Sequence, residues 1–374
     1  MPLTLNDEQA MLRDTAREFV AEHAPVAHLR HLRDADDPTG FSRDLWKRFA
    51  EMGFTGILIG EDQGGLGLGH VEAGVVLEEI GRNLSPSPFL STAVAAVAAL
   101  RGTPHGERWF PGILAGETVA ALAIDEGSKH SARIAMTAER AGNGFRLTGA
   151  KQFVAYGHVA DLIVVAARTS GSPADDEGIT LFAVHKDAAN LTNVPERLAD
   201  SSIASRLTFD GVEVDADAVI GEVDAGAGRL NALLAAGRAG ASAELLGVGV
   251  GAMDMTVGYL KDRKQFGQPI GSFQALQHRA AHLYAEMEVA RAAVLKAQQL
   301  LDAGDPAGEA VSVAKAMTGL AATLAVQEGI QMHGGIGMTD EYDIGFFMKR
   351  TRVLVELFGD SNFHADKLAR AAGF

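Results

Sequence analysis

The sequence predicts an α+β fold in three successive parts: an N-terminal helical domain, a central small antiparallel β domain and a C-terminal four-helix bundle. The spacing of apolar residues changes near residue 117, from helical intervals to short β-prone runs, and returns to helical intervals near residue 220. Turn-forming clusters separate the β-prone runs, whereas the helical parts contain long uninterrupted stretches. We therefore expect domains at residues 1–117, 118–220 and 221–374.

The N-terminal part opens with a helix start signal. Asn6 and Gln9 have the spacing of a capping box, and Leu12, Phe19 and Val20 follow at helical intervals. A glycine-rich loop and a Ser-Pro-Ser-Pro break then separate further amphipathic segments. These signals predict a domain made of several helices.

The central part has strand-like composition and spacing. Turn clusters at residues 141–144 and 169–173 separate short β-prone runs, which favours a small antiparallel sandwich or barrel over βαβ units. The runs occupy residues 118–124, 133–137, 145–147, 162–166, 179–184 and 205–209.

The C-terminal part returns to longer helices. An apolar stripe from Leu276 to Leu301 has members three and four residues apart, which is typical of an antiparallel helix bundle. A turn at residues 302–306 ends this helix, and residues 310–332 form the next. Gly247, Gly249 and Gly251 follow no strand, so we interpret them as small residues for close helix packing rather than as a dinucleotide loop.

Composition excludes several classes of function. The 374 residues include 33 Lys and Arg against 48 Asp and Glu, and this net charge of −15 argues against nucleic acid as a partner. The absence of Cys excludes disulfides, thiolate zinc sites and a Cys nucleophile. No metal site is expected, because His23, His28 and His31 have no arrangement of carboxylates that suggests a metal, and a solvated helix face explains them. A charged N-terminus and the lack of a long apolar run predict a cytoplasmic protein without a membrane span.

Two short segments carry chemical information. In residues 262–277, Arg263 and Lys264 close a helix, and Gly267 and Pro269 turn the chain; a helix–turn–helix corner is the simpler interpretation. In residues 331–339, glycines follow a helix, where free N–H groups can bind phosphate oxygens; a glycine helix cap is the alternative.

Together, and with residues 149–154, 209–214 and 220–221, these segments resemble the acyl-CoA dehydrogenase flavoprotein family over almost the whole chain. The resemblance implies FAD between the β domain and the bundle, a homotetramer or related dimer, and an electron-accepting flavoprotein as partner. It implies that Arg263 and Phe266 contact the FAD pyrophosphate across a subunit interface. The other implied FAD contacts are Gln331, Gly334 and Gly335 from the same neighbouring chain, and Ser361, Asp125, Ser131 and Phe153.

The resemblance also implies an activity, the dehydrogenation of an acyl-CoA thioester to the trans-2-enoyl-CoA, within lipid metabolism such as fatty acid or sterol degradation. A carboxylate in a dry pocket would remove the α-proton. Gly237, Arg238 and Ala241 would contact the substrate, and the small residues here would admit a branched or polycyclic acyl group.

The catalytic base departs from the family pattern. The stretch 357–361 lacks the usual Glu, and Gly237-Arg238 stands where other members have Glu-Arg. Glu244, seven residues beyond Gly237, and Asp360 are the remaining candidates. Glu244 could instead pair with an Arg such as Arg238, and Asp360 could cap the last helix. Without a base, the chain would be a catalytically incomplete subunit beside a sister chain. A third hypothesis is an oxygen-using flavoenzyme on the same fold.

Overall fold

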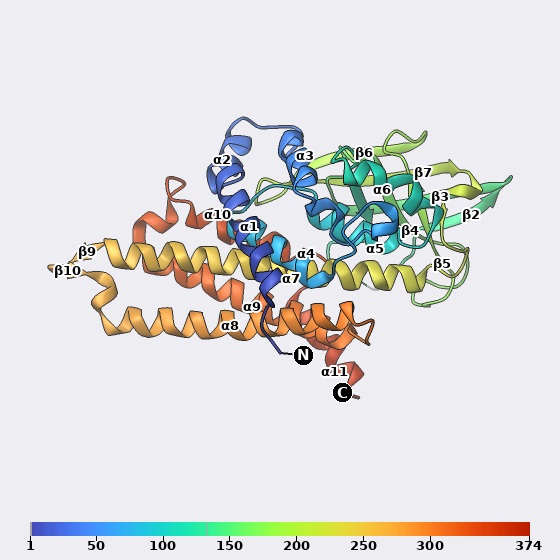
Figure 1. Cartoon of the computed structure of the whole chain (residues 1–374). Coiled ribbons are helices and arrows are strands. Elements are labelled where there is room, and N and C mark those ends of the chain that lie inside the picture. Colours follow the sequence, from blue (N-terminus) through green and yellow to red (C-terminus); the bar gives the residue numbers. More distant parts are fainter. Residues whose placement is uncertain (1, 132) are drawn as a thin grey trace. The chain divides into compact units, whose positions relative to one another are not determined.

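The computed structural model describes residues 2–131 and 133–374 (Figure 1). The chain divides into two compact units, each assembled from segments that are separated in sequence. The bundle unit comprises Met1–His31, His70–Ser85 and Arg238–Phe374, and the sheet unit comprises Leu32–Gly69 and Pro86–Gly237. The predicted order of helices, sheet and helices is confirmed. The predicted domains are continuous stretches of sequence, whereas each unit combines separate segments, so the predicted boundaries stay predictions.

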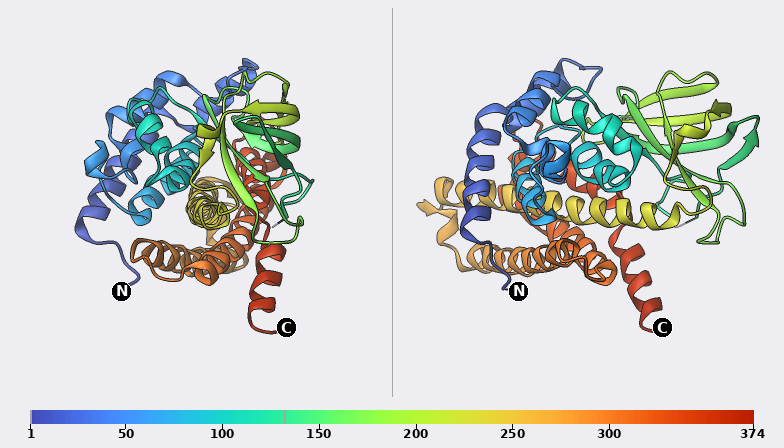
Figure 2. Two further views of the ribbon diagram at one scale, coloured as in Figure 1. Left: turned by 90° about the vertical axis from the view of Figure 1, so that its right-hand side faces the viewer. Right: turned by 45° about the vertical axis from the view of Figure 1, so that its right-hand side comes forward.

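The bundle unit is built around long helices. Figures 1 and 2 show α8 (Gln274–Asp302) and α9 (Gly308–His333) side by side. Helix α7 (Ala227–Asp262) enters this unit at Arg238. The remaining elements are α1 (Asp7–His23), α4 (His70–Arg82), β9 (Lys264–Gln265), β10 (Gln268–Pro269), η5 (Ile270–Ser272), η6 (Gly334–Met338), α10 (Ile344–Glu356) and α11 (Ser361–Ala371), while α2 (Val26–Asp34) extends from this unit into the next.

Helix α1 begins as the sequence predicts. The Asn6 side chain accepts a hydrogen bond from the Gln9 backbone N–H at 2.8 Å, and the Gln9 side chain accepts one from the Asn6 N–H at 3.0 Å. This capping box satisfies two N–H groups that the helix itself leaves unbonded.

Helices α4 and α7 approach each other through glycines, as the sequence predicts. A β-carbon added at Gly247 would lie 1.9 Å from the Glu78 carbonyl oxygen, and one added at Gly81 would lie 2.1 Å from the Glu244 carbonyl oxygen. Only glycine, which has no β-carbon, allows two helix backbones to approach this closely.

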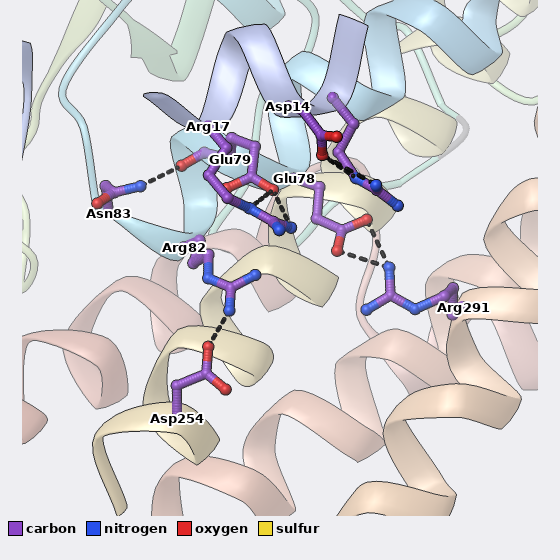
Figure 3. Close-up of polar contacts among 9 residues, drawn as sticks. Asp14, Arg17, Glu78, Glu79, Arg82, Asn83, Asp254 and Arg291 are labelled. Carbon is purple, nitrogen blue, oxygen red and sulfur yellow. Dashed lines mark hydrogen bonds and ion pairs between the residues drawn. The ribbon is translucent and has the colours of Figure 1, made fainter. Parts of the chain in front are cut away.

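Charged side chains tie the other helices to α4 (Figure 3). Arg17 of α1 donates to the fully buried Glu79 at 2.9 and 3.1 Å, and Arg291 of α8 binds Glu78 at 2.6 and 2.7 Å. Arg82 pairs with Asp254 of α7. A buried carboxylate is tolerated only when it is paired, so Glu79 in particular requires its contact with Arg17 of α1.

The sheet unit contains an eight-stranded sheet in the order β6-β7-β3-β2-β4-β5-β8, with β1 beside β4. Most neighbours are antiparallel, as expected, whereas β1 runs parallel to β4 and Thr137 of β2 pairs in parallel with Arg168 of β4. The strands are β1 (Ala120–Ala123), β2 (Thr137–Ala141), β3 (Gly144–Ala155), β4 (Leu162–Arg168), β5 (Ile179–Val184), β6 (Leu191–Arg197), β7 (Ile203–Val214) and β8 (Val219–Ile220). The sequence did not indicate β6, because its side chains are mostly exposed and Pro195 interrupts the pattern.

Short helices complete the sheet unit. They are α3 (Arg43–Glu51), η1 (Phe54–Gly56), η2 (Glu61–Gln63), η3 (Leu90–Ala96), α5 (Val97–Leu100), α6 (Pro104–Leu114) and η4 (Ala216–Ala218). The sheet core is apolar and includes Phe145, Phe182 and Phe209, none more than 2% exposed.

The predicted lack of any stretch long enough to span a membrane needs correction. Two helical segments, Ala227–Asp262 and Gly308–Met338, are long and apolar enough by length and composition. The most apolar window of the first is 94% buried, as in the core helix of a folded domain, and that of the second is 56% buried. Their many Ala and Gly residues account for the missed signal.

Candidate functional site

An exposed aromatic residue marks the tip of the β9–β10 hairpin. Gln265 pairs with Gln268, and the intervening Phe266 and Gly267 both have positive φ angles, 55° and 82°. Such a two-residue turn favours Asn or Gly at its first position, so Phe266 carries backbone strain. Its side chain is 92% exposed, and its ring lies edge-on to that of Phe273 with the ring centroids 6.1 Å apart.

Arg263 immediately precedes this hairpin. Its backbone N–H donates to the Tyr259 carbonyl at 2.9 Å, and its carbonyl accepts from Ile270 at 2.8 Å. Within residues 2–131 and 133–374 its guanidinium makes no hydrogen bond or ion pair. A fixed backbone with an unengaged guanidinium suits the binding of a phosphate or carboxylate.

A glycine turn lies at the same end of the bundle unit. His333 ends α9 and packs its ring against Tyr259 of α7, with ring centroids 4.5 Å apart. Gly334 follows with φ +66°, and β-carbons added at Gly334 or Gly335 would meet nothing within 4 Å. The contact therefore brings the predicted residues Gln331, Gly334 and Gly335 to the end that carries Arg263 and Phe266.

Burial lowers the pKa of His333, whose Nδ1 lies 2.6 Å from the Gly329 carbonyl oxygen. The ring therefore favours its neutral form and donates from Nδ1. The sequence places His333 directly before two glycines but gives no indication of its contact with Tyr259.

A second group of predicted residues meets at residues 357–361. Arg238 of α7 donates from Nε to the Phe358 carbonyl at 3.0 Å. Asp360 accepts a hydrogen bond from the Phe363 N–H at 2.8 Å and so caps α11, which confirms the alternative considered for it. The Ser361 hydroxyl donates to the Ala316 carbonyl of α9 at 3.1 Å. The structure thus brings Arg238, Asp360 and Ser361 together.

Lys315 completes this group, and the sequence did not single it out. It is 1% exposed and donates to the carbonyls of Val355 and Gly359, both at 2.9 Å. Burial, helped by the nearby Arg238 charge, lowers the pKa of Lys315 to about 7. In the sequence it is an isolated lysine in an alanine-rich helix, and only its position on the apolar face of that helix could have indicated it.

Glu244 is buried, as expected, but its partner differs from the one considered. Its carboxylate pairs with Arg350 of α10, and Nε of Arg238 donates to the Phe358 carbonyl. The role of Glu244 as base stays a prediction. Gly237 and Ala241 are buried in α7 near it in sequence.

In the sheet unit, Phe153 is 46% exposed, has φ +54° and lies where the register between β3 and β7 shifts. A bulky residue in this conformation is rare and marks a candidate functional position. The neighbouring Gln152 N–H donates to the Asp125 carbonyl at 2.7 Å. The structure therefore brings the residue before Phe153 against the backbone of Asp125.

Two carboxylates order the loop that follows β1. Asp125 accepts a hydrogen bond from His130 at 2.7 Å, and Glu126 binds the buried Lys151 at 2.7 Å. Burial lowers the pKa of Lys151. Ser131 is exposed within the segment between β1 and β2. His130, Glu126 and Lys151 were not predicted, because their pairing depends on the folded loop.

Comparison with known proteins identifies the family. Models of the acyl-CoA dehydrogenase N-terminal, middle and C-terminal domains match residues 6–117, 122–212 and 224–373. The acyl-CoA dehydrogenase IpdE2 of Mycobacterium tuberculosis is 31% identical over 356 residues, which are 95% of this chain and 94% of that protein.

Solved structures agree with this match. The Tcur3481-Tcur3483 steroid ACAD is similar with a TM-score of 0.89 and 30% identity, covering 99% of this chain and 100% of that one. The ChsE4-ChsE5 complex of Mycobacterium tuberculosis is similar with a TM-score of 0.89 and 26% identity, covering both chains fully. The chain belongs to the acyl-CoA dehydrogenase family of oxidoreductases.

Proposed function

We propose that the chain uses FAD to dehydrogenate an acyl-CoA thioester between its α and β carbons, giving the trans-2-enoyl-CoA. The observation that carries the proposal is the end of the bundle unit where Arg263, Phe266 and the turn at Gly334 gather. FAD, when bound, supplies the acceptor for the β-hydrogen as hydride.

The residues present fit a flavin dinucleotide. The guanidinium of Arg263 has no protein partner within the described residues, and its planar fork matches a diphosphate. The open backbone at Gly334 and Gly335 lets a ligand approach closely. Phe266 and Phe153 present exposed aromatic rings from strained backbone positions, which supports their use in binding.

Removal of the α-proton needs a carboxylate within hydrogen-bond reach of the substrate. We propose Glu244 for this role, with Asp360 as the second candidate. Both side chains also have structural partners, Arg350 and the Phe363 N–H. Glu244 would therefore have to turn away from Arg350 when the substrate binds.

This engagement of Glu244 favours a second candidate function. The chain would then be one subunit of a tetramer with two chain types, in which a sister chain supplies the base. Similarity to the ChsE4-ChsE5 complex supports this alternative. In either case an electron-accepting flavoprotein would reoxidise the enzyme, and the steroid ACAD similarity supports a polycyclic acyl group as substrate.

The experiment is to purify the chain alone, measure its bound FAD, and follow flavin bleaching without oxygen under straight-chain, branched and steroid-derived acyl-CoA thioesters. Bleaching by one of them supports dehydrogenation by this chain. Bleaching only after a sister chain is added supports the two-subunit alternative. A colourless protein that takes up no FAD in either state contradicts both.

The variant Glu244→Gln then tests the base. It keeps the size of the side chain but cannot accept the α-proton, so we expect bound FAD with no bleaching. Asp360→Asn tests the second candidate base in the same way. Normal bleaching by Glu244→Gln would refute the assignment.

A further inference from the structure

The turn after α10 is held in a strained conformation. Phe358 has φ +59° although it is a bulky residue, and Gly359 follows with φ +107°. A β-carbon at Gly359 would lie 2.5 Å from the Phe363 ring and 3.0 Å from Nε2 of His364. Backbone strain of this kind at a bulky residue persists only where surrounding contacts impose it.

Two buried basic side chains impose it here. Lys315 reaches from α9 to the carbonyls of Val355 and Gly359, and Arg238 reaches from α7 to the carbonyl of Phe358. Lys315 is 1% exposed and Arg238 is 7% exposed. The carbonyl oxygens at the end of α10 and in the turn thus bind side chains of two other helices.

The hydrogen bonds of Lys315 match a neutral amine. Its two acceptors are both backbone carbonyls, and a neutral amine has two N–H donors. Each N–H of the neutral amine therefore has one carbonyl acceptor. The lowered pKa of Lys315 agrees with this count. The charged groups around it are Arg238 of α7, Glu356 at the end of α10 and Asp360 at the start of α11.

The same turn carries residues of the candidate site. Asp360 directly follows Gly359, and the Ser361 hydroxyl donates to the carbonyl of Ala316, the residue after Lys315 in α9. A β-carbon at Gly319 of α9 would lie 2.5 Å from the Ser361 hydroxyl oxygen. Any change in the turn would therefore displace Asp360, Ser361 and the backbone that Arg238 contacts.

We infer that Lys315 is a positioning residue of the reaction: it holds residues 357–361 in one conformation so that the side chains of this turn meet the acyl-CoA and the coenzyme in register. The inference rests on the proposed function. Lys315 touches only the backbone of the turn and acts through it.

The test compares Lys315→Met with the wild-type protein. Methionine has a similar length and helix propensity but no donor for the two carbonyls. We expect the rate of flavin reduction, expressed per bound flavin, to fall on the order of 10–100-fold, as expected for a small misplacement of reacting groups. FAD content is measured alongside, and because the rate is expressed per bound flavin, a loss of FAD through displacement of Ser361 does not count as a loss of rate. Lys296→Met on the exposed face of α8 is the control.

Hydrogen–deuterium exchange of the peptide covering residues 357–361 gives the second readout. We expect its amides to exchange at least about tenfold faster in Lys315→Met than in the wild type, with α8 unchanged. Lys315→Gln, which keeps N–H donors on a shorter side chain, is expected to be intermediate and serves if the Met variant does not fold.

The outcomes separate the two claims. A variant that melts earlier but reduces its flavin at the wild-type rate, with normal exchange in the turn, overturns the inference and leaves Lys315 with a stabilising role alone. If no acyl-CoA reduces the wild type, the proposed function fails, and the exchange experiment still decides whether Lys315 holds the turn.

Discussion

Arg350 directs Nε and Nη2 to a single carboxylate oxygen of Glu244, at distances of 3.0 and 2.5 Å. The Glu244 side chain is 3% exposed and that of Arg350 is 22% exposed, so the pair is largely shielded from water. It joins α7 to α10. The carboxylate proposed as base therefore also holds two helices together, and the two roles can be separated by measurement.

Arg350→Met is expected to leave Glu244 buried without its ion-pair partner. Loss of one partner from a buried pair typically lowers the unfolding free energy by about 3–5 kcal/mol, and the double variant with Glu244→Gln should recover part of this loss. Urea denaturation measures both. Arg370→Met, which breaks an exposed pair with Asp366, is the control and should change little. Equal stability of Arg350→Met and wild type would show that the pair does not hold α7 to α10.

Alanine at Gly247 and alanine at Gly258 should have opposite effects, although both lie in α7. The new β-carbon at position 247 would meet the Glu78 carbonyl at 1.9 Å, whereas that at position 258 would meet nothing within 4 Å. We expect Gly247→Ala to cost about 1–3 kcal/mol or more, and Gly258→Ala to add up to about 1 kcal/mol through helix propensity. Thermal unfolding decides; a tolerated Gly247→Ala would contradict the close contact with α4.

Arg263→Met is expected to weaken FAD binding by about 10–100-fold, because hydrogen bonds to charged groups contribute about 1.5–3 kcal/mol. Stability of the apoprotein should not change, since this guanidinium has no partner within the described residues. Fluorescence titration of apoprotein with FAD measures the affinity. The neighbouring exposed Lys264→Met is the control, and equal losses in both variants would point to net charge rather than to a site at Arg263.

Lys315 should make stability depend on pH above neutrality. Its pKa is about 7 in the folded chain and 10.5 ordinarily, so between these values the unfolded chain binds a proton that the folded chain has released. The unfolding free energy should therefore rise with pH over this window. Urea denaturation at several pH values between 7 and 10 measures this free energy. It should rise more steeply with pH in the wild type than in Lys315→Met. Parallel curves would mean that Lys315 keeps its ordinary pKa.

Local signals in the sequence were sufficient for part of this structure. The capping box at Asn6, the helix cap at Asp360 and the glycine contacts of α7 were all predicted, because each depends on residues within one helix or on their size. The bundle followed from apolar spacing in the same way.

Contacts between distant segments were not predictable. Glu244 lies 106 residues from Arg350, and Lys315 lies 44 residues from Gly359, so no periodicity links them. The choice of Arg350 over Arg238 depends on where α10 packs. Strand β6 was missed for a different reason, because an exposed edge strand has no apolar alternation to reveal it.

The meeting of Gly81 with the Glu244 carbonyl limits how that glutamate can move. Since the two backbones are already in contact, α7 has no freedom to slide or roll against α4 at this level. The carboxylate can therefore approach a substrate only by rotation about its own side-chain bonds, while the backbone of Glu244 stays in place.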